Sequence, residues 1–168
     1  MNSEFPILQR GEGPIASDTY LPASPANVLW GRLPCRTDAP VLTIMPGTSV
    51  TIDTVSHEGI LEDQGRDPVA YFAGHGVPRA RVLADATEIA ASYDRTKRNF
   101  DVDGPHVVTG PVAVAGAEPG DVLVIDGKGD QTAALMGTLM LSACKKRGLA
   151  GVIVDAAIRD KLEILELD

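Results

Sequence analysis

The sequence lacks the features that mark secreted, membrane-spanning and nucleic-acid-binding proteins. Its two cysteines, Cys35 and Cys144, lie far apart without CxxC spacing, which disfavours a disulfide framework or zinc knuckle and favours a reducing compartment. Residues 1–10 show no signal-peptide pattern, and no apolar run is long enough to span a membrane. Residues 145–147 form the largest basic cluster in a chain of net charge −8. We therefore expect a soluble cytoplasmic protein that binds neither nucleic acid nor membranes.

The composition that remains is that of an ordinary globular protein. A chain of 168 residues with 44% hydrophobic and 23% charged residues can bury a core, as one domain or two small ones. The pattern predicts a mixed α/β fold, with an N-terminal segment (1–20), a β-rich part (20–118) and a strand-helix-strand unit (119–168). Short strands are expected at 41–45, 49–55, 121–126 and 149–154, and two more on either side of a Gly-Pro break within 106–116. A helix is expected to begin at Pro78.

The C-terminal unit predicts a parallel crossover. A helix is expected over residues 131–147, with Asp130 as its N-cap and Gly148 as its C-terminal stop. Its apolar residues run from Ala133 to Cys144 and leave almost no polar face, so the sequence predicts a helix covered by a sheet and by another subunit. The apolar run at 149–154 is typical of a strand buried on both faces. We expect a homo-oligomer.

Histidines and carboxylates gather in the middle of the chain, mostly on a polar, glycine-rich loop. Imidazole and carboxylate groups together suit zinc or a similar divalent ion, which can acidify a bound water. The alternative is a solvated acidic loop with surface histidines, since no HExxH-type motif is present. The residues concerned are Asp53, His57, Glu58, Glu62, Asp63, Asp67, His75 and His106.

Residues from about 20 to 126, about two thirds of the chain, resemble the acetamidase/formamidase family. The most specific stretches are VSHEGILEDQGRDP (56–68) and the run from His106 to Leu123, HVVTGPVAVAGAEPGDVL. The resemblance implies a β-rich, oligomeric hydrolase of small linear amides, in which a metal, favoured to be zinc, activates water. By position it implies His57 and Glu58 as catalytic residues and His57, Asp63 and His106 as metal ligands.

Residues 119–168 resemble another family, that of ribonuclease activity regulator A, whose relatives include hydroxymethylglutarate/carboxyhydroxymethyl-oxaloacetate aldolases. The resemblance rests on GDVLVIDGKGDQ, a glycine in the following helix and VDAAIRD at a strand end. It implies a swivelling β/β/α fold, commonly trimeric, that acts on oxo-acids. It also implies that Arg159 binds the substrate, that Asp160 helps to hold Mg²⁺, and that the turn Gly137-Thr138-Leu139 faces the substrate carboxylate. Relatives often carry an acid or glycine where this chain has Thr138.

Three functions follow for this small-molecule site. The amide hydrolase comes first, because that resemblance covers more of the chain and all three histidines. The first alternative is a Mg²⁺-dependent lyase that uses Arg159 and Asp160. The second alternative is a catalytically incomplete oligomerising or regulatory protein, because each resemblance lacks segments of its family. Zinc retained by the protein would favour the hydrolase, and Mg²⁺-dependent formation of pyruvate would favour the lyase. If neither is observed, the third function is favoured.

Overall fold

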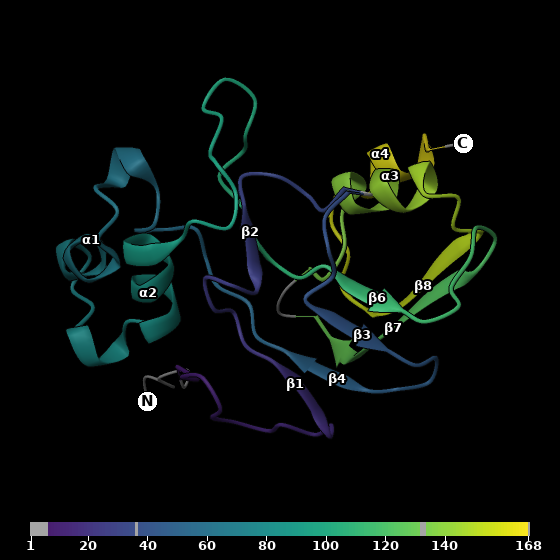
Figure 1. The fold of residues 1–168 in the computed structure, drawn as a ribbon, viewed down its shortest axis with the longest axis horizontal. Coiled ribbons are helices and arrows are strands. Elements are labelled where there is room, and N and C mark those ends of the chain that lie inside the picture. The colour runs from purple at the N-terminus through teal and green to yellow at the C-terminus, as the bar shows by residue number, and fades with distance from the viewer. Residues whose placement is uncertain (1–6, 36, 132–133, 168) are drawn as a thin grey trace. The chain divides into compact units, whose positions relative to one another are not determined.

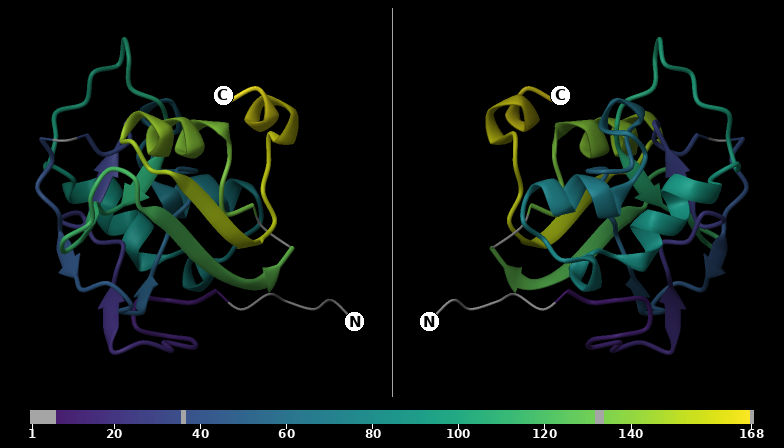
Figure 2. Two further views of the ribbon diagram at one scale, coloured as in Figure 1. Left: turned by 90° about the vertical axis from the view of Figure 1, so that its right-hand side faces the viewer. Right: turned by 90° about the vertical axis from the view of Figure 1, so that its left-hand side faces the viewer.

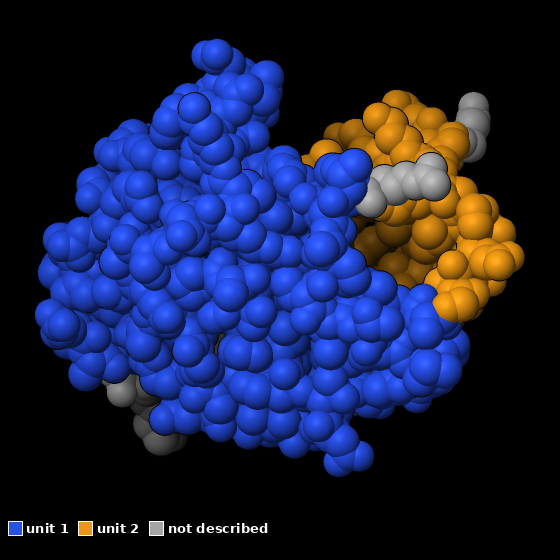
Figure 3. Space-filling model, in the orientation of Figure 1, with its two compact units in different colours: residues 1–115 blue, residues 116–168 orange. Residues whose placement is uncertain are grey.

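The structure, a computed structural model, describes residues 7–35, 37–131 and 134–167. It confirms the mixed α/β class, with short strands and helices along the whole chain (Figure 1). The chain divides into two compact units, Met1–Ala115 (unit 1) and Gly116–Asp168 (unit 2), which Figure 3 colours separately. The domain boundaries drawn from the sequence remain a proposal, because compactness alone does not show that each part folds by itself.

Unit 1 is built on three pairs of three-residue strands. The pair β1–β4 is parallel, β2–β5 is antiparallel and β3–β6 is parallel, so strands distant in sequence meet in every pair. Trp30 lies opposite Val107 in the antiparallel pair. The strands are β1 (Thr19–Leu21), β2 (Val28–Trp30), β3 (Leu42–Ile44), β4 (Val50–Ile52), β5 (Val107–Thr109) and β6 (Val112–Val114).

The helices of unit 1 differ from the sequence expectation. Only a 3-10 turn (Arg79–Arg81) follows Pro78, because the backbone is extended at both Pro78 and Val82. Helix α2 (Ala84–Ser92) begins after that interruption. The loop predicted after residue 56 contains a 3-10 turn (Glu62–Gln64) and then α1 (Pro68–Gly74). Helix α1 begins where Asp67 caps it, since the Asp67 side chain accepts a hydrogen bond from Ala70 N at 3.0 Å.

The core of unit 1 surrounds Trp30, which is 1% exposed. The Tyr93 ring meets it edge-on at 5.9 Å, and the Arg98 guanidinium lies 4.6 Å from its centroid. The buried cluster joins β2 to helix α2 and to the segment before α1 through Ala23, Val28, Trp30, Ile60, Ala86, Ile89 and Ala90.

Unit 2 contains the parallel crossover. Strands β7 (Val122–Asp130) and β8 (Gly151–Ala156) pair in parallel, which confirms the prediction, and α3 (Thr138–Lys146) connects them. The short α4 (Lys161–Leu165) follows β8. Helices α3 and α4 lie on the same side of the β7–β8 ribbon (Figures 1 and 2).

Two details of unit 2 correct the prediction. Helix α3 begins at Thr138 and not at residue 131; its N-cap is Gly137, and Asp130 belongs to β7. Ala133, which was assigned to the helix, lies outside the described residues. Nor do the other elements of unit 2 cover α3 by themselves, because Leu139 is 58% exposed and no residue of the helix is buried. Strand β8 also leaves Ile153 exposed, so unit 2 by itself does not bury both faces of this strand.

Candidate functional site

The predicted arginine-aspartate pair lies beside the start of α3. The chain leaving β8 runs alongside the segment that precedes α3, where Met136 forms a parallel bridge with Ile158. Two backbone hydrogen bonds hold these segments together, from Leu135 N to the carbonyl of residue 157 (3.0 Å) and from Arg159 N to Met136 O (3.0 Å). The structure thereby brings together residues 137–139 and the pair Arg159-Asp160, which are about twenty positions apart in sequence.

Gly137 allows this close approach. A Cβ atom at position 137 would lie 2.6 Å from Asp160 Oδ2 and 3.1 Å from the Arg159 side chain. Its φ of −151° is extended backbone that any residue adopts, so the position requires glycine for space and not for conformation. Gly137 is buried, and its carbonyl accepts a hydrogen bond from Leu141 N.

Asp160 has a constrained backbone and a half-open carboxylate. Its φ of 62° is left-handed, a conformation that aspartate tolerates better than most residues. Its Oδ2 accepts a hydrogen bond from Thr138 N at 3.2 Å and lies 3.6 Å from Arg159 Nε. The side chains of Arg159 and Asp160 are 66% and 40% exposed. Solvent therefore reaches both groups while the carboxylate is held at the first turn of α3.

The chemistry of this corner combines opposite charges. The guanidinium presents a planar fork for a carboxylate, and the first amides of α3 add positive partial charge. The Asp160 carboxylate is a hard oxygen donor of the kind that Mg²⁺ prefers, and Mg²⁺ commonly binds through one or two carboxylates while it keeps several waters. A site with one carboxylate therefore suits that ion. Within the described ranges, no three His, Cys, Asp or Glu residues are grouped to hold a metal.

The histidine loop of unit 1 forms a hydrogen-bonded network around Glu58. His57 Nε2 lies 3.5 Å from Glu58 Oε1, and the His57 and His106 rings meet edge-on at 5.3 Å. The Tyr71 hydroxyl (2.6 Å) and the Gln64 amide (2.7 Å) both donate to Glu58 Oε2, and these bonds lower the pKa of the carboxyl. The hydrogen bond from the Tyr71 hydroxyl to Glu58 also raises the pKa of Tyr71.

Sequence reasoning did not identify Tyr71 and Gln64 as partners of Glu58. The signal that could have indicated Tyr71 is the helix start at Asp67-Pro68, because Tyr71 lies on the first turn of that helix. Asp63 is exposed, and among the described residues it belongs to no group of three possible metal ligands. Its role as a metal ligand stays a prediction.

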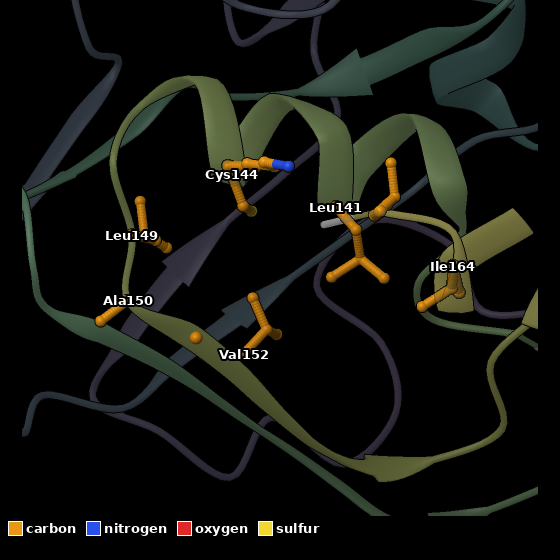
Figure 4. A pocket seen from close by; sticks show the side chains of 9 residues that line it. Leu141, Cys144, Leu149, Ala150, Val152 and Ile164 are labelled. Carbon is orange, nitrogen blue, oxygen red and sulfur yellow. The ribbon is translucent and has the colours of Figure 1, made fainter.

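Unit 2 also contains a hollow of about 380 Å³ that the sequence did not indicate. It lies between α3, β8 and α4, and Figure 4 shows Leu141, Val152 and Ile164 pointing into it from these three elements. Cys144 and Leu149 extend the apolar lining. It lies against α3 but does not include Arg159 or Asp160, so we distinguish it from the charged corner.

Comparison with known families agrees with the geometry of unit 2. The model of the RraA-like family, described as Aldolase/RraA, matches residues 38–168. The chain belongs to this family. The match includes the histidine loop and the run from His106 to Leu123, which the sequence analysis had assigned to an amidase. The hydrolase function was therefore wrong, and zinc has no support.

Two relatives share short stretches with this RraA-like chain. A protein of Halalkalibacterium halodurans, provisionally named 4-hydroxy-4-methyl-2-oxoglutarate aldolase, is 57% identical over 44 residues, which are 26% of this chain and 21% of the relative. A protein of Alkalilimnicola ehrlichii with the same provisional name is 41% identical over 54 residues, 31% of this chain and 34% of the relative. The chain thus spans about a fifth and a third of these relatives. No solved structure gives a significant match.

The lyase alternative of the sequence analysis agrees with these names better than the amidohydrolase does. None of the helices in the described ranges has the length and apolar character needed to cross a membrane.

Proposed function

We propose that this RraA-like chain binds a small oxo-acid at the corner of Arg159, Asp160 and the start of α3, and that it takes part in a divalent-metal-dependent aldolase reaction. The observation that carries the proposal is the convergence at Gly137, whose missing side chain leaves room for both Arg159 and Asp160. The family match and the names of the two relatives support the reaction class.

Each residue has a distinct part in this proposal. Arg159 binds the oxo-acid through its guanidinium, which is exposed enough to reach a ligand. The backbone of Gly137, Thr138 and Leu139 faces the substrate carboxylate, where the N-terminus of α3 favours negative charge. Thr138 N holds Asp160 Oδ2, so the carboxylate is fixed before a ligand arrives.

Asp160 is the residue that would hold Mg²⁺. Bound there, the ion would polarise the oxo group of the substrate and stabilise negative charge that develops beside it. Arg159 meanwhile orients the substrate carboxylate and offsets its charge. The predicted zinc ligands His57, Asp63 and His106 have no part in this function.

The direct test uses the full chain, 4-hydroxy-4-methyl-2-oxoglutarate and Mg²⁺, with pyruvate release as the readout. We expect release that requires the metal and stops with a chelator. Arg159→Lys should lower kcat/KM about a hundredfold, because an ammonium cannot reproduce the two-pronged contact. Arg147→Lys, in the same unit but at the other end of α3, is the matched control and should keep the wild-type rate. A wild-type protein that forms no pyruvate with Mg²⁺ present contradicts the proposal.

A second candidate is a catalytically incomplete protein that assembles through unit 2, as the sequence analysis also considered. One observation favours assembly: large apolar side chains of unit 2 are exposed in the single chain, and such surface promotes association. They include Val124, Leu139, Ile153, Leu162 and Leu165. We propose a homo-oligomer, and the mass in solution from light scattering tests it. An oligomer without pyruvate formation would favour this second candidate.

A further inference from the structure

The chain segment before β1 attaches to helix α2 through the side chain of Gln9. Gln9 Nε2 donates to Val82 O at 3.1 Å, and Gln9 Oε1 accepts from Ala84 N at 3.0 Å. Ala84 is the first residue of α2, and its neighbour Leu83 provides no side-chain cap. Gln9 therefore supplies, from a distant part of the sequence, the cap that the helix lacks locally.

Arg10 forms the second attachment. Its guanidinium lies 2.5 Å from Asp85 Oδ1 and 2.5 Å from Glu88 Oε2, both on α2. The Asp85 side chain is only 7% exposed, and burial raises the pKa of its carboxyl, whereas Arg10 acts in the opposite direction. Removing Arg10 would leave a buried carboxylate without its cation, so this contact favours the attached state.

Ile7, just before these two residues, forms part of the wall of a hollow of about 190 Å³. The hollow extends from α1 to α2, and Phe72, Val82, Leu83 and Ala86 give it an apolar lining. Glu58 of the histidine loop lies at the same hollow. Ile7 therefore places this segment at the edge of an apolar site that borders the Glu58 network.

The attachments are made by side chains, and the chain turns soon after them. Gly11 and Gly13 have φ values of 77° and 87°, a region that favours glycine. Residues 7–10 belong to no strand, and β1 begins only at Thr19. The segment can therefore detach without disturbing a sheet. It also lies outside residues 38–168, which match the family.

We propose that residues 7–10 are a releasable strap that closes the apolar hollow between α1 and α2. Its contacts are Gln9 on the start of α2, Arg10 on Asp85 and Glu88, and Ile7 at the hollow. When the strap is attached, the hollow is closed on that side. When it is released, the hollow and the adjacent Glu58 become accessible. This inference does not depend on the aldolase function.

Digestion with trypsin tests whether the strap is released, because trypsin must bind the Arg10 side chain in order to cleave the Arg10–Gly11 bond. In the full-length wild-type protein, Arg10 is held by its two carboxylates, and we expect this cut to be slower than the cut after the exposed Lys97. Gln9→Ala keeps the trypsin site but removes two hydrogen bonds. It should speed the Arg10 cut about tenfold, measured by mass spectrometry of the released peptide.

Two controls separate strap release from general loosening. Gln131→Ala, at an exposed glutamine of unit 2, should leave the Arg10 cut at the wild-type rate. The rate after Lys97 should be unchanged in Gln9→Ala, and the variant should bind more anilinonaphthalene sulfonate, a probe of apolar surface. A wild-type rate at Arg10 in Gln9→Ala, or an equal rise after Lys97, would overturn the proposal.

Discussion

The two units of this chain differ in how many apolar side chains they bury. Among the described residues, unit 1 contains nearly all of the fully buried apolar side chains, and unit 2 contributes Met136 alone. Unit 1 surrounds Trp30 with side chains from several elements, whereas α3 and β8 of unit 2 leave Leu139 and Ile153 exposed. A short unit with so little buried surface gains little stability from its own core. The proposed chemistry therefore belongs to the unit that is packed less well.

The largest expected effect tests whether unit 1 depends on Trp30. Trp30→Ala should lower the free energy of unfolding by about 3–5 kcal/mol, because it empties the centre of the buried cluster. The measurement is denaturant unfolding followed by circular dichroism, since Trp30 is the only tryptophan and fluorescence would be lost. Phe100→Ala, at a ring that is 69% exposed, is the control and should change stability by less than about 0.5 kcal/mol. Equal losses would mean that Trp30 does not centre the core.

The next largest effect tests whether the proposed site in unit 2 needs a glycine at position 137. Gly137→Ala should reduce kcat/KM about a hundredfold, because the new methyl group would displace Asp160 and Arg159 from the start of α3. Gly151→Ala is the matched control: Gly151 also has no left-handed backbone requirement, and no atom lies within 4 Å of its would-be Cβ. Comparable kinetics in the two variants would show that close approach at position 137 is not required.

The smallest effect concerns acid stability in unit 1. Arg32 donates two hydrogen bonds to Asp38, each 2.6 Å long, and holds the pKa of that carboxyl well below its usual range. A lowered folded-state pKa adds stability above about pH 4, which is lost as the pH falls further. Asp38→Asn should cost about 1 kcal/mol at neutral pH, since Arg32 is partly exposed.

The Asp38→Asn variant should also lose less stability than the wild type between about pH 4 and pH 2. Urea unfolding at several pH values measures both effects. A difference between the two proteins that stays constant with pH would show that this carboxylate does not contribute to acid sensitivity.

The sequence predicted the parallel crossover of unit 2 because strand, helix and strand follow each other with clear breaks. It placed the start of α3 too early, because the apolar pattern continues upstream through Leu135 and Met136, which lie in the extended segment beside Ile158. Apolar spacing alone does not distinguish a helix from a buried extended segment. Asp160 Oδ2 accepts a hydrogen bond from Thr138 N, the first residue of α3, and local spacing does not reveal this contact.

The site was predicted in part. Gly137, Arg159 and Asp160 were named with the help of family resemblance, and the structure brings them together. The hydrolase function failed because it depended on a resemblance of the first part of the chain to an amidase family, whereas the RraA-like family matches residues 38–168. In the structure, Glu58 accepts hydrogen bonds from Tyr71 and Gln64, which the sequence analysis did not name. The strap was missed because Gln9 and Ala84 are 75 residues apart.

Gly31 has a consequence for how the chain tolerates change. Its backbone N–H donates to His106 O at 2.8 Å, and its carbonyl accepts from Gly104 N at 2.6 Å. Its φ is 100°, and a Cβ atom there would lie 2.0 Å from Arg98 Nη1. The Arg98 guanidinium, which lies over the Trp30 ring, would then have to shift. Glycine at position 31 thus leaves the space in which the Arg98 guanidinium stacks on Trp30.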